Sequence, residues 1–271
     1  MASPHNQALT DPIRELMDFA EIFTGVVKGH SESQVLLASV QSQIKIPASV
    51  FSEVISDTHN RLDVIEEIIP QLEEVDPDLR ESALGALAKI RNLIEFCPYV
   101  INVGDARKAM SLSSTAPLRA LSPIVRTRIA YPRITREERQ IAQAEIAQLI
   151  SWLEEHELHD KDFIRQALLV GLRRTNLRLS WFGWFGWIGT LASLREVVAA
   201  YMSLESMATT PGTNPDAEIV LRKTRAMISV VFDKLKVAKD VADVGAYGVA
   251  AYAILTKAAM PAMTHVAGLL R

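Results

Sequence analysis

The stretch DPIRELMDFAEIFTGVVKG, residues 11–29, contains both a helix-start signal and a helical apolar pattern. Asp11 followed by Pro12 is typical of a helix start, because an aspartate side chain caps free backbone N–H groups and proline fits the first turn. Apolar residues then recur at helical spacing as far as Val27, and Gly29 ends the pattern. The stretch therefore predicts a helix with one apolar face, which must be buried against other elements.

Similar apolar stripes occur three more times before residue 110. They run over residues 33–46, 51–69 and 77–97, and each is followed directly by a proline. Proline ends a helix because it lacks a backbone N–H and clashes with the preceding turn. Four amphipathic helices with short connections bury their stripes against one another. The sequence therefore predicts an N-terminal bundle of about four helices over residues 1–110.

The pattern breaks at residues 111–133, SLSSTAPLRALSPIVRTRIAYPR, which contain three prolines and no sustained period. We expect a linker or an extended segment here, and we place a domain boundary at this stretch. A second helical unit is predicted over residues 134–271, where Thr135 and Glu138 form a capping-box motif at its start. No stretch alternates with period two for long enough to predict a sheet, so the expected fold class is all-α.

The net charge of −3 hides an uneven distribution along the chain. Residues 1–110 carry 9 basic and 17 acidic side chains, whereas residues 111–133 carry four arginines and no acid. An acidic surface repels nucleic acid and anionic lipid. The later arginines do not share one helix face and have acidic neighbours, so we do not expect a nucleic-acid partner.

The start of the chain shows no basic region followed by an apolar stretch, which a secretory signal requires. Cys97 is the single cysteine, so the chain cannot form a disulfide within itself. We therefore expect a cytoplasmic protein, with peripheral attachment to a membrane as an alternative.

The most unusual segment is RRTNLRLSWFGWFGWIG, residues 173–189, which holds three of the four tryptophans at intervals of three residues. Tryptophan favours membrane and protein interfaces because its ring is apolar while its N–H needs a polar partner, and arginines beside it can reach anionic headgroups. The uncharged run that follows has 16 residues, fewer than the roughly 18 to 20 that cross a bilayer. The predicted residues for membrane or partner contact are Arg173, Arg174, Arg178, Trp181, Phe182, Trp184, Phe185 and Trp187.

The alternative for this segment is a structural role. Gly183, Gly186 and Gly189 would permit a tight corner between helices, with the tryptophans filling the core around it. The same choice applies to residues 244–270, which are apolar and rich in glycine and alanine. Small residues allow close approach of helices both in membranes and in tightly packed proteins.

His156 and His159, with the acidic residues around them, form the one cluster with metal-capable side chains. The string is hydrophilic and bridges two predicted helices, so a solvated turn is the expected structure and no metal or other cofactor is expected. The chain contains no Gly-x-Ser-x-Gly, Walker loop, dinucleotide fingerprint or His-Glu-x-x-His.

These observations favour a non-enzymatic helical interaction protein whose second half contacts a protein partner or a membrane surface. The acidic bundle would keep the apolar helices covered until docking exposes them. One alternative is a soluble homo-oligomeric scaffold in which the apolar surface packs against another copy. The other is an all-α enzyme or metal-binding protein that uses His156 and His159.

Overall fold

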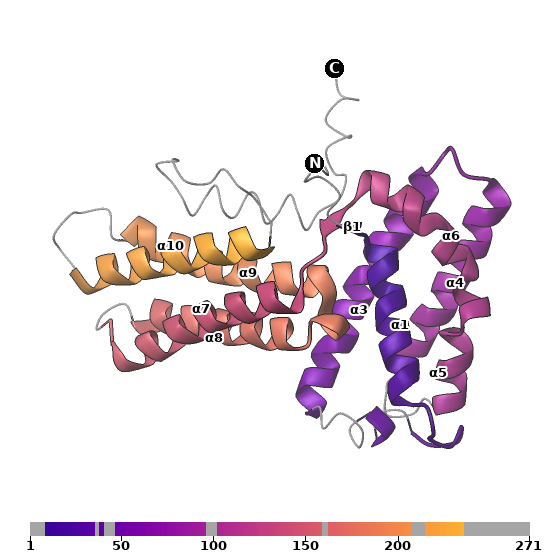
Figure 1. Ribbon diagram of the computed structural model, residues 1–271, viewed down its shortest axis with the longest axis horizontal. Helices are drawn as coiled ribbons and strands as arrows, with labels where there is room; N and C mark the ends of the chain where they lie inside the picture. Colours follow the sequence, from indigo (N-terminus) through magenta and orange to yellow (C-terminus); the bar gives the residue numbers. More distant parts are fainter. Residues whose placement is uncertain are drawn as a thin grey trace, which may run out of the picture. The chain divides into compact units, whose positions relative to one another are not determined.

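The computed structural model describes residues 9–35, 38–40, 47–95, 102–158, 162–207 and 215–235. These residues are almost entirely helical, which confirms the all-α class (Figure 1). Four features named above lie wholly or mostly outside the described residues: the predicted helix over residues 33–46, Cys97, His159, and the apolar stretch over residues 244–270.

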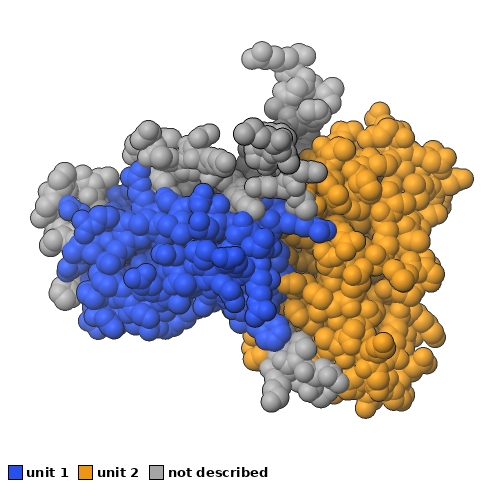
Figure 2. Space-filling view, viewed as in Figure 1, with its two compact units in different colours: residues 1–8, 132–182, 189–271 blue, residues 9–131, 183–188 orange. Residues whose placement is uncertain are grey.

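The chain divides into two compact units (Figure 2). Unit 2 comprises residues 9–131 and 183–188, and unit 1 comprises residues 1–8, 132–182 and 189–271. Unit 2 contains α1 (Pro12–Val26), α3 (Ala48–Ile68), a short 3-10 helix η1 (Ile69–Gln71), α4 (Pro77–Glu95), α5 (Val103–Ala109) and α6 (Leu112–Arg128). The two-residue strand β1 (Leu9–Thr10) pairs with β2 (Tyr131–Pro132).

Helix α1 begins as its sequence predicts. The side chain of Asp11 accepts a hydrogen bond from the backbone N–H of Arg14, and Pro12 occupies the first turn. The apolar face of α1 is buried in the core of unit 2 through Ile13, Leu16, Met17, Phe19, Ala20 and Phe23. The helix packs against α3 and α6, so its apolar stripe is buried as its amphipathic pattern requires.

The structure differs from the sequence prediction at residues 112–128, which form helix α6 and not an extended linker. The Ser111 side chain caps this helix by accepting from the N–H of Ser114. A buried stripe of Thr115, Leu118, Leu121, Ser122 and Val125 packs it against α1 and α4. Pro117 and Pro123 each remove a backbone donor, but burial of the stripe outweighs that loss.

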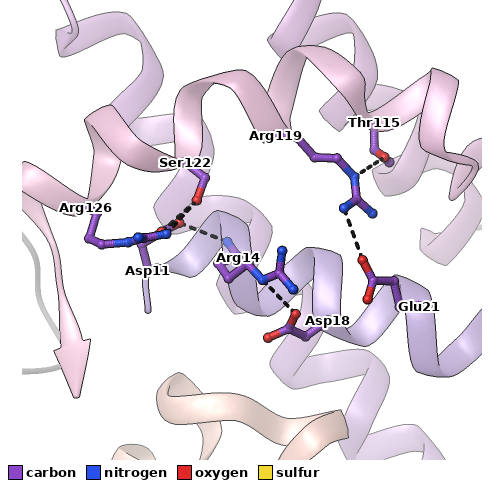
Figure 3. A network of polar contacts seen from close by, with 8 residues as sticks. All are labelled: Asp11, Arg14, Asp18, Glu21, Thr115, Arg119, Ser122 and Arg126. Atoms are coloured by element: carbon purple, nitrogen blue, oxygen red, sulfur yellow. Dashed lines mark hydrogen bonds and ion pairs between the residues drawn. The ribbon is translucent and has the colours of Figure 1, made fainter. Parts of the chain in front are cut away.

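Polar contacts also join α6 to α1 (Figure 3). The Oδ2 atom of Asp11, which is fully buried, accepts from Ser122 Oγ at 2.8 Å and from Nε and Nη2 of Arg126 at 3.1 and 3.0 Å. Farther along, Arg119 Nη1 lies 3.1 Å from Glu21 Oε1. Asp11 therefore both caps α1 and neutralises an arginine of α6.

The remaining helices belong to unit 1, apart from residues 183–188 of α9. They are α7 (Arg136–Glu155), α8 (Asp162–Ser180), α9 (Phe182–Met207) and α10 (Pro215–Leu235). Helix α7 packs against both α8 and α10. The capping box at its start is confirmed, since the Thr135 side chain accepts from the Glu138 N–H while the Glu138 side chain accepts from the Thr135 N–H. Within the ranges given above, no helix has the length and apolar character needed to span a membrane.

Candidate functional site

The residues Gly183–Ile188, here called the aromatic segment, lie in unit 2, although the residues on both sides of them belong to unit 1. Trp184, Phe185 and Trp187 are buried there, with exposed fractions of 5%, 0% and 1%. The ring of Trp184 meets Phe19 and Phe23 of α1 edge-on, at centroid distances of 5.7 and 6.5 Å. The ring of Trp187 stacks on Tyr131 at 6.1 Å. These three aromatic side chains thus complete the core of unit 2.

Gly186 breaks the helical backbone in the middle of the segment. Its φ of 62° and ψ of −165° place it in a region that is essentially restricted to glycine. A Cβ atom added at Gly186 would lie 2.5 Å from Glu15 Oε2 and 2.6 Å from Arg61 Nη2. Both the backbone conformation and the available space therefore require glycine at this position.

Two buried charged side chains hold the backbone on either side of Gly186. The N–H of Trp187 donates to both carboxylate oxygens of Glu15 at 3.0 Å. Arg61 Nη2 donates to the carbonyl oxygen of Phe185 at 2.7 Å. The two side chains form an ion pair in which Arg61 Nε lies 3.9 Å from Glu15 Oε2. The kink is thus held by polar contacts to α1 and α3 as well as by aromatic packing.

This pair carries an electrostatic cost. Burial raises the pKa of Glu15 to about 7, although the positive charge of Arg61 and the Trp187 N–H both oppose the rise. Burial also lowers the pKa of Arg61 and raises that of Tyr131. Within the described part of the chain, Nε and Nη1 of Arg61 have no hydrogen-bond partner. The site therefore contains charges that are only partly compensated.

The structure separates the residues predicted for membrane or partner contact into two groups. Trp184, Phe185 and Trp187 are in the core of unit 2, which agrees with the structural alternative for these three. Trp181 and Phe182 are half-buried in unit 1, where the Arg139 guanidinium lies 5.5 Å from the Phe182 ring centroid. Contact through Trp184 and Trp187 would require these side chains to leave the core.

The three predicted arginines all have partners within unit 1. Arg173 Nη2 lies 2.6 Å from Glu154 Oε1, and Arg174 Nη1 lies 2.6 Å from Glu196 Oε2. Arg178 is buried and donates from Nη1 to the carbonyl oxygen of Gly189 at 2.8 Å. Their charges are thus directed toward the protein's own carboxylates and backbone in this conformation.

Sequence reasoning missed Glu15 and Arg61, yet each leaves a signal in the pattern. Glu15 lies four residues before Phe19, and eight before Phe23, so it falls on the apolar face of α1. Arg61 lies three residues after Thr58 and four before Ile65, which are also buried on one face of α3. A charge on each of two apolar faces indicates a buried pair, but the sequence does not show that the third participant comes from α9.

His156, which the sequence offers as a weak candidate for metal binding, contacts Trp152. Its ring stacks on the indole at a centroid distance of 4.1 Å, and its Nδ1 lies 2.7 Å from the Trp152 carbonyl oxygen. Searching the placed residues finds no group of three His, Cys, Asp or Glu side chains arranged to hold a metal ion. The structure therefore gives no support to a metal role for His156.

A small hollow in unit 1 lies between α7 and α10. It has a volume of about 210 Å³ and is lined by Glu145, Gln148, Leu149, Trp152, Lys223, Ala226 and Met227. The Lys223 ammonium lies 4.9 Å from the centroid of the Trp152 ring. Ligand sites for small molecules are usually larger, about 300 to 1,000 Å³, and more enclosed. The buried Glu15–Arg61 pair is therefore the stronger candidate for a functional feature.

No protein-family model, curated protein or solved structure matches this chain. Its function is therefore inferred from the site alone.

Proposed function

We propose that this protein is a non-enzymatic helical interaction protein in which the aromatic segment is the contact element and unit 2 is its cover. The observation that carries the proposal is the bond from the Trp187 N–H to both oxygens of Glu15 in a buried site. This bond ties the segment to a carboxylate whose burial is unfavourable. The segment is thus held in place by contacts that a partner can replace.

A core that served stability alone would favour apolar side chains at these positions. Replacing a buried ion pair with apolar residues of similar volume is often neutral or stabilising, by about 1 to 4 kcal/mol. The raised pKa of Glu15 reflects the cost of burying this carboxylate. Perturbed carboxylates are concentrated at functional sites, and Gly186 adopts a backbone conformation that only glycine takes without strain. These features support a segment that is released under some conditions.

The contacts favour a protein partner over a membrane. In the hydrocarbon of a bilayer the N–H of Trp187 and the carbonyl of Phe185 would lose their charged partners, at a cost of several kcal/mol for each unsatisfied group. The arginines Arg173, Arg174 and Arg178, which would have to attract anionic headgroups, are engaged within unit 1. A protein surface can supply both an acceptor and a donor to the kink. The cytoplasmic location predicted from the sequence stays a prediction.

An enzymatic role for the buried pair has less support. A carboxylate with a pKa of about 7 suits general acid–base chemistry. However, the aromatic segment fills the space beside it so closely that one added carbon at Gly186 would lie 2.5 Å from Glu15 Oε2. A substrate has no room at this carboxylate while the segment is in place.

The proposal is tested by comparing Gly186→Ala with Gly85→Ala. The methyl group at residue 186 would overlap Glu15 and Arg61, whereas a Cβ atom added at Gly85 of α4 would meet nothing within 4 Å beyond the adjacent backbone of its own helix. We expect Gly186→Ala to keep its helical circular dichroism while acrylamide quenches its tryptophans more strongly at neutral pH. Gly85→Ala should match the parent protein.

Flotation with vesicles of phosphatidylcholine, with and without phosphatidylserine, then separates partner from membrane. We expect neither variant to float with either vesicle. If Gly186→Ala floats with either vesicle, the partner of the aromatic segment is a membrane surface and not a protein. Unchanged quenching in Gly186→Ala would contradict the proposal that the segment can be released.

A further inference from the structure

The core of unit 2 is closed by a segment from a distant part of the chain. Among the described residues, the chain passes between the units at Tyr131–Pro132 and at the two ends of the aromatic segment. Only residues 133–135 separate β2 from α7, and they have no regular secondary structure. A change of backbone direction at this short connection would therefore break no helix.

The side chains of unit 2 that receive the segment, here called the socket, are Phe19, Phe23, Tyr131, Glu15 and Arg61. If the segment left and nothing replaced it, the aromatic rings would face water. Arg61 would also lose the Phe185 carbonyl as its acceptor. Exposed apolar surface beside an incompletely paired charge favours association with another surface. An empty socket therefore needs a new occupant.

We propose that this occupant is the aromatic segment of a second copy of the chain, exchanged reciprocally between two protomers. The inference rests on the proposed function, because it requires that the segment can be released. A second copy supplies an occupant that is known to fit, with a glycine in the left-handed region between two buried aromatic residues. The exchange recreates every contact of the socket in both protomers, so the dimer closes with two-fold symmetry.

The exchange should depend on protein concentration, because the aromatic segment is covalently connected to its own unit 2. A segment on the same chain competes at an effective concentration in the millimolar range, so the monomer dominates in dilute solution. Exchange increases when the protein is concentrated or is refolded at high concentration.

A disulfide between segment and socket tests the exchange. In Ile22→Cys/Gly183→Cys, made with Cys97→Ser, the two cysteines would occupy facing positions in unit 2, because a Cβ atom at Gly183 would lie 2.6 Å from Cδ1, the end of the Ile22 side chain. The protein is refolded and oxidised at about 10 μM and about 500 μM, and run on a denaturing gel without reductant. We expect bridged monomer at the lower concentration and a several-fold larger share of bridged dimer at the higher one.

Two outcomes would overturn the exchange. The first is a bridge that stays within one chain at the higher concentration. The second is an equal amount of covalent dimer from the single variants Ile22→Cys and Gly183→Cys, which would reveal surface cross-linking. Hydrogen exchange at the Trp187 amide of the parent protein distinguishes failure of the exchange between protomers from failure of the proposed function. An amide that opens locally without any bridged dimer rejects only the second copy, whereas an amide that opens only on global unfolding rejects release itself.

Discussion

The backbone N–H of Trp187 donates to both carboxylate oxygens of Glu15, which lies 172 residues earlier in the chain, at 3.0 Å. This bond ties the aromatic segment to helix α1. Three features act on this hydrogen bond, because its acceptor is a buried carboxylate. They are the protonation of Glu15, the charge of Arg61 and the backbone conformation of Gly186. Each can be changed separately.

The stability of unit 2 should decrease as pH rises through neutrality. The pKa of Glu15 is raised from 4.5 to about 7 in the folded protein, so the folded state binds the extra proton between these values. The stability contribution of this group is fully present below pH 4.5 and is lost as pH rises through 7. We expect the unfolding free energy to fall by about 3 kcal/mol over this interval through Glu15.

Urea denaturation of the parent protein and of Glu15→Gln between pH 4.5 and 8 measures this contribution. The difference between the two curves should fall with pH, because glutamine cannot titrate. The charged and titratable groups that act on Glu15 are Arg61 of α3, Tyr131 of β2, the α1 cap residue Asp11, and Asp18 within α1. They are present in both proteins. A flat or rising difference would show that burial does not raise this pKa.

Removing one member of the charge pair should cost more than removing both. Arg61→Met leaves Glu15 buried without its counter-charge, and we expect a loss of about 3 to 5 kcal/mol. In Glu15→Gln/Arg61→Met the Trp187 N–H keeps an acceptor and neither position 15 nor position 61 carries a charge, so about half of that loss should be recovered. A double-mutant cycle by chemical denaturation measures the coupling. Simple additivity of the two single effects would contradict a direct pair.

Asp11 should contribute far more to stability than the nearby Asp18. Asp11→Ala removes both the cap of α1 and the acceptor of Ser122 and Arg126, with an expected loss of about 3 kcal/mol. Asp18→Ala removes a half-exposed ion pair with Arg14, and should change stability by no more than about 1 kcal/mol. Thermal unfolding of the two variants side by side makes the comparison. Equal effects would show that the α1–α6 contacts in Figure 3 contribute little.

The two alanine substitutions for glycine should have opposite effects on stability. Gly186→Ala forces a side chain into a region reserved for glycine and against two charged groups, so we expect a loss of about 3 kcal/mol. Gly85→Ala lies in an open helical position and should gain about 0.5 to 1 kcal/mol. Denaturation midpoints measured at one pH test the difference. A neutral Gly186→Ala would mean that the kink can be relaxed without loss.

The sequence predicts α1 and α7 well because their caps, apolar stripes and ends agree with one another. It fails at α6, where Pro117 and Pro123 suggest a linker although tertiary burial of one face keeps the helix intact. The sequence marks the aromatic segment as unusual, but it does not show what surrounds the segment. Glu15 and Arg61 come together with Trp187 only through tertiary structure, and spacing along one helix carries no information about such contacts.

The most direct test of the proposed function is native-state hydrogen exchange at the Trp187 amide, compared with core amides of α1 such as that of Phe19. We expect Trp187 to exchange through a local opening whose free energy lies well below that of global unfolding. This opening should become easier as pH rises through 7, after correction for the intrinsic exchange rate. Exchange of both amides at the free energy of global unfolding, at every pH, would show that the aromatic segment is an ordinary part of the core.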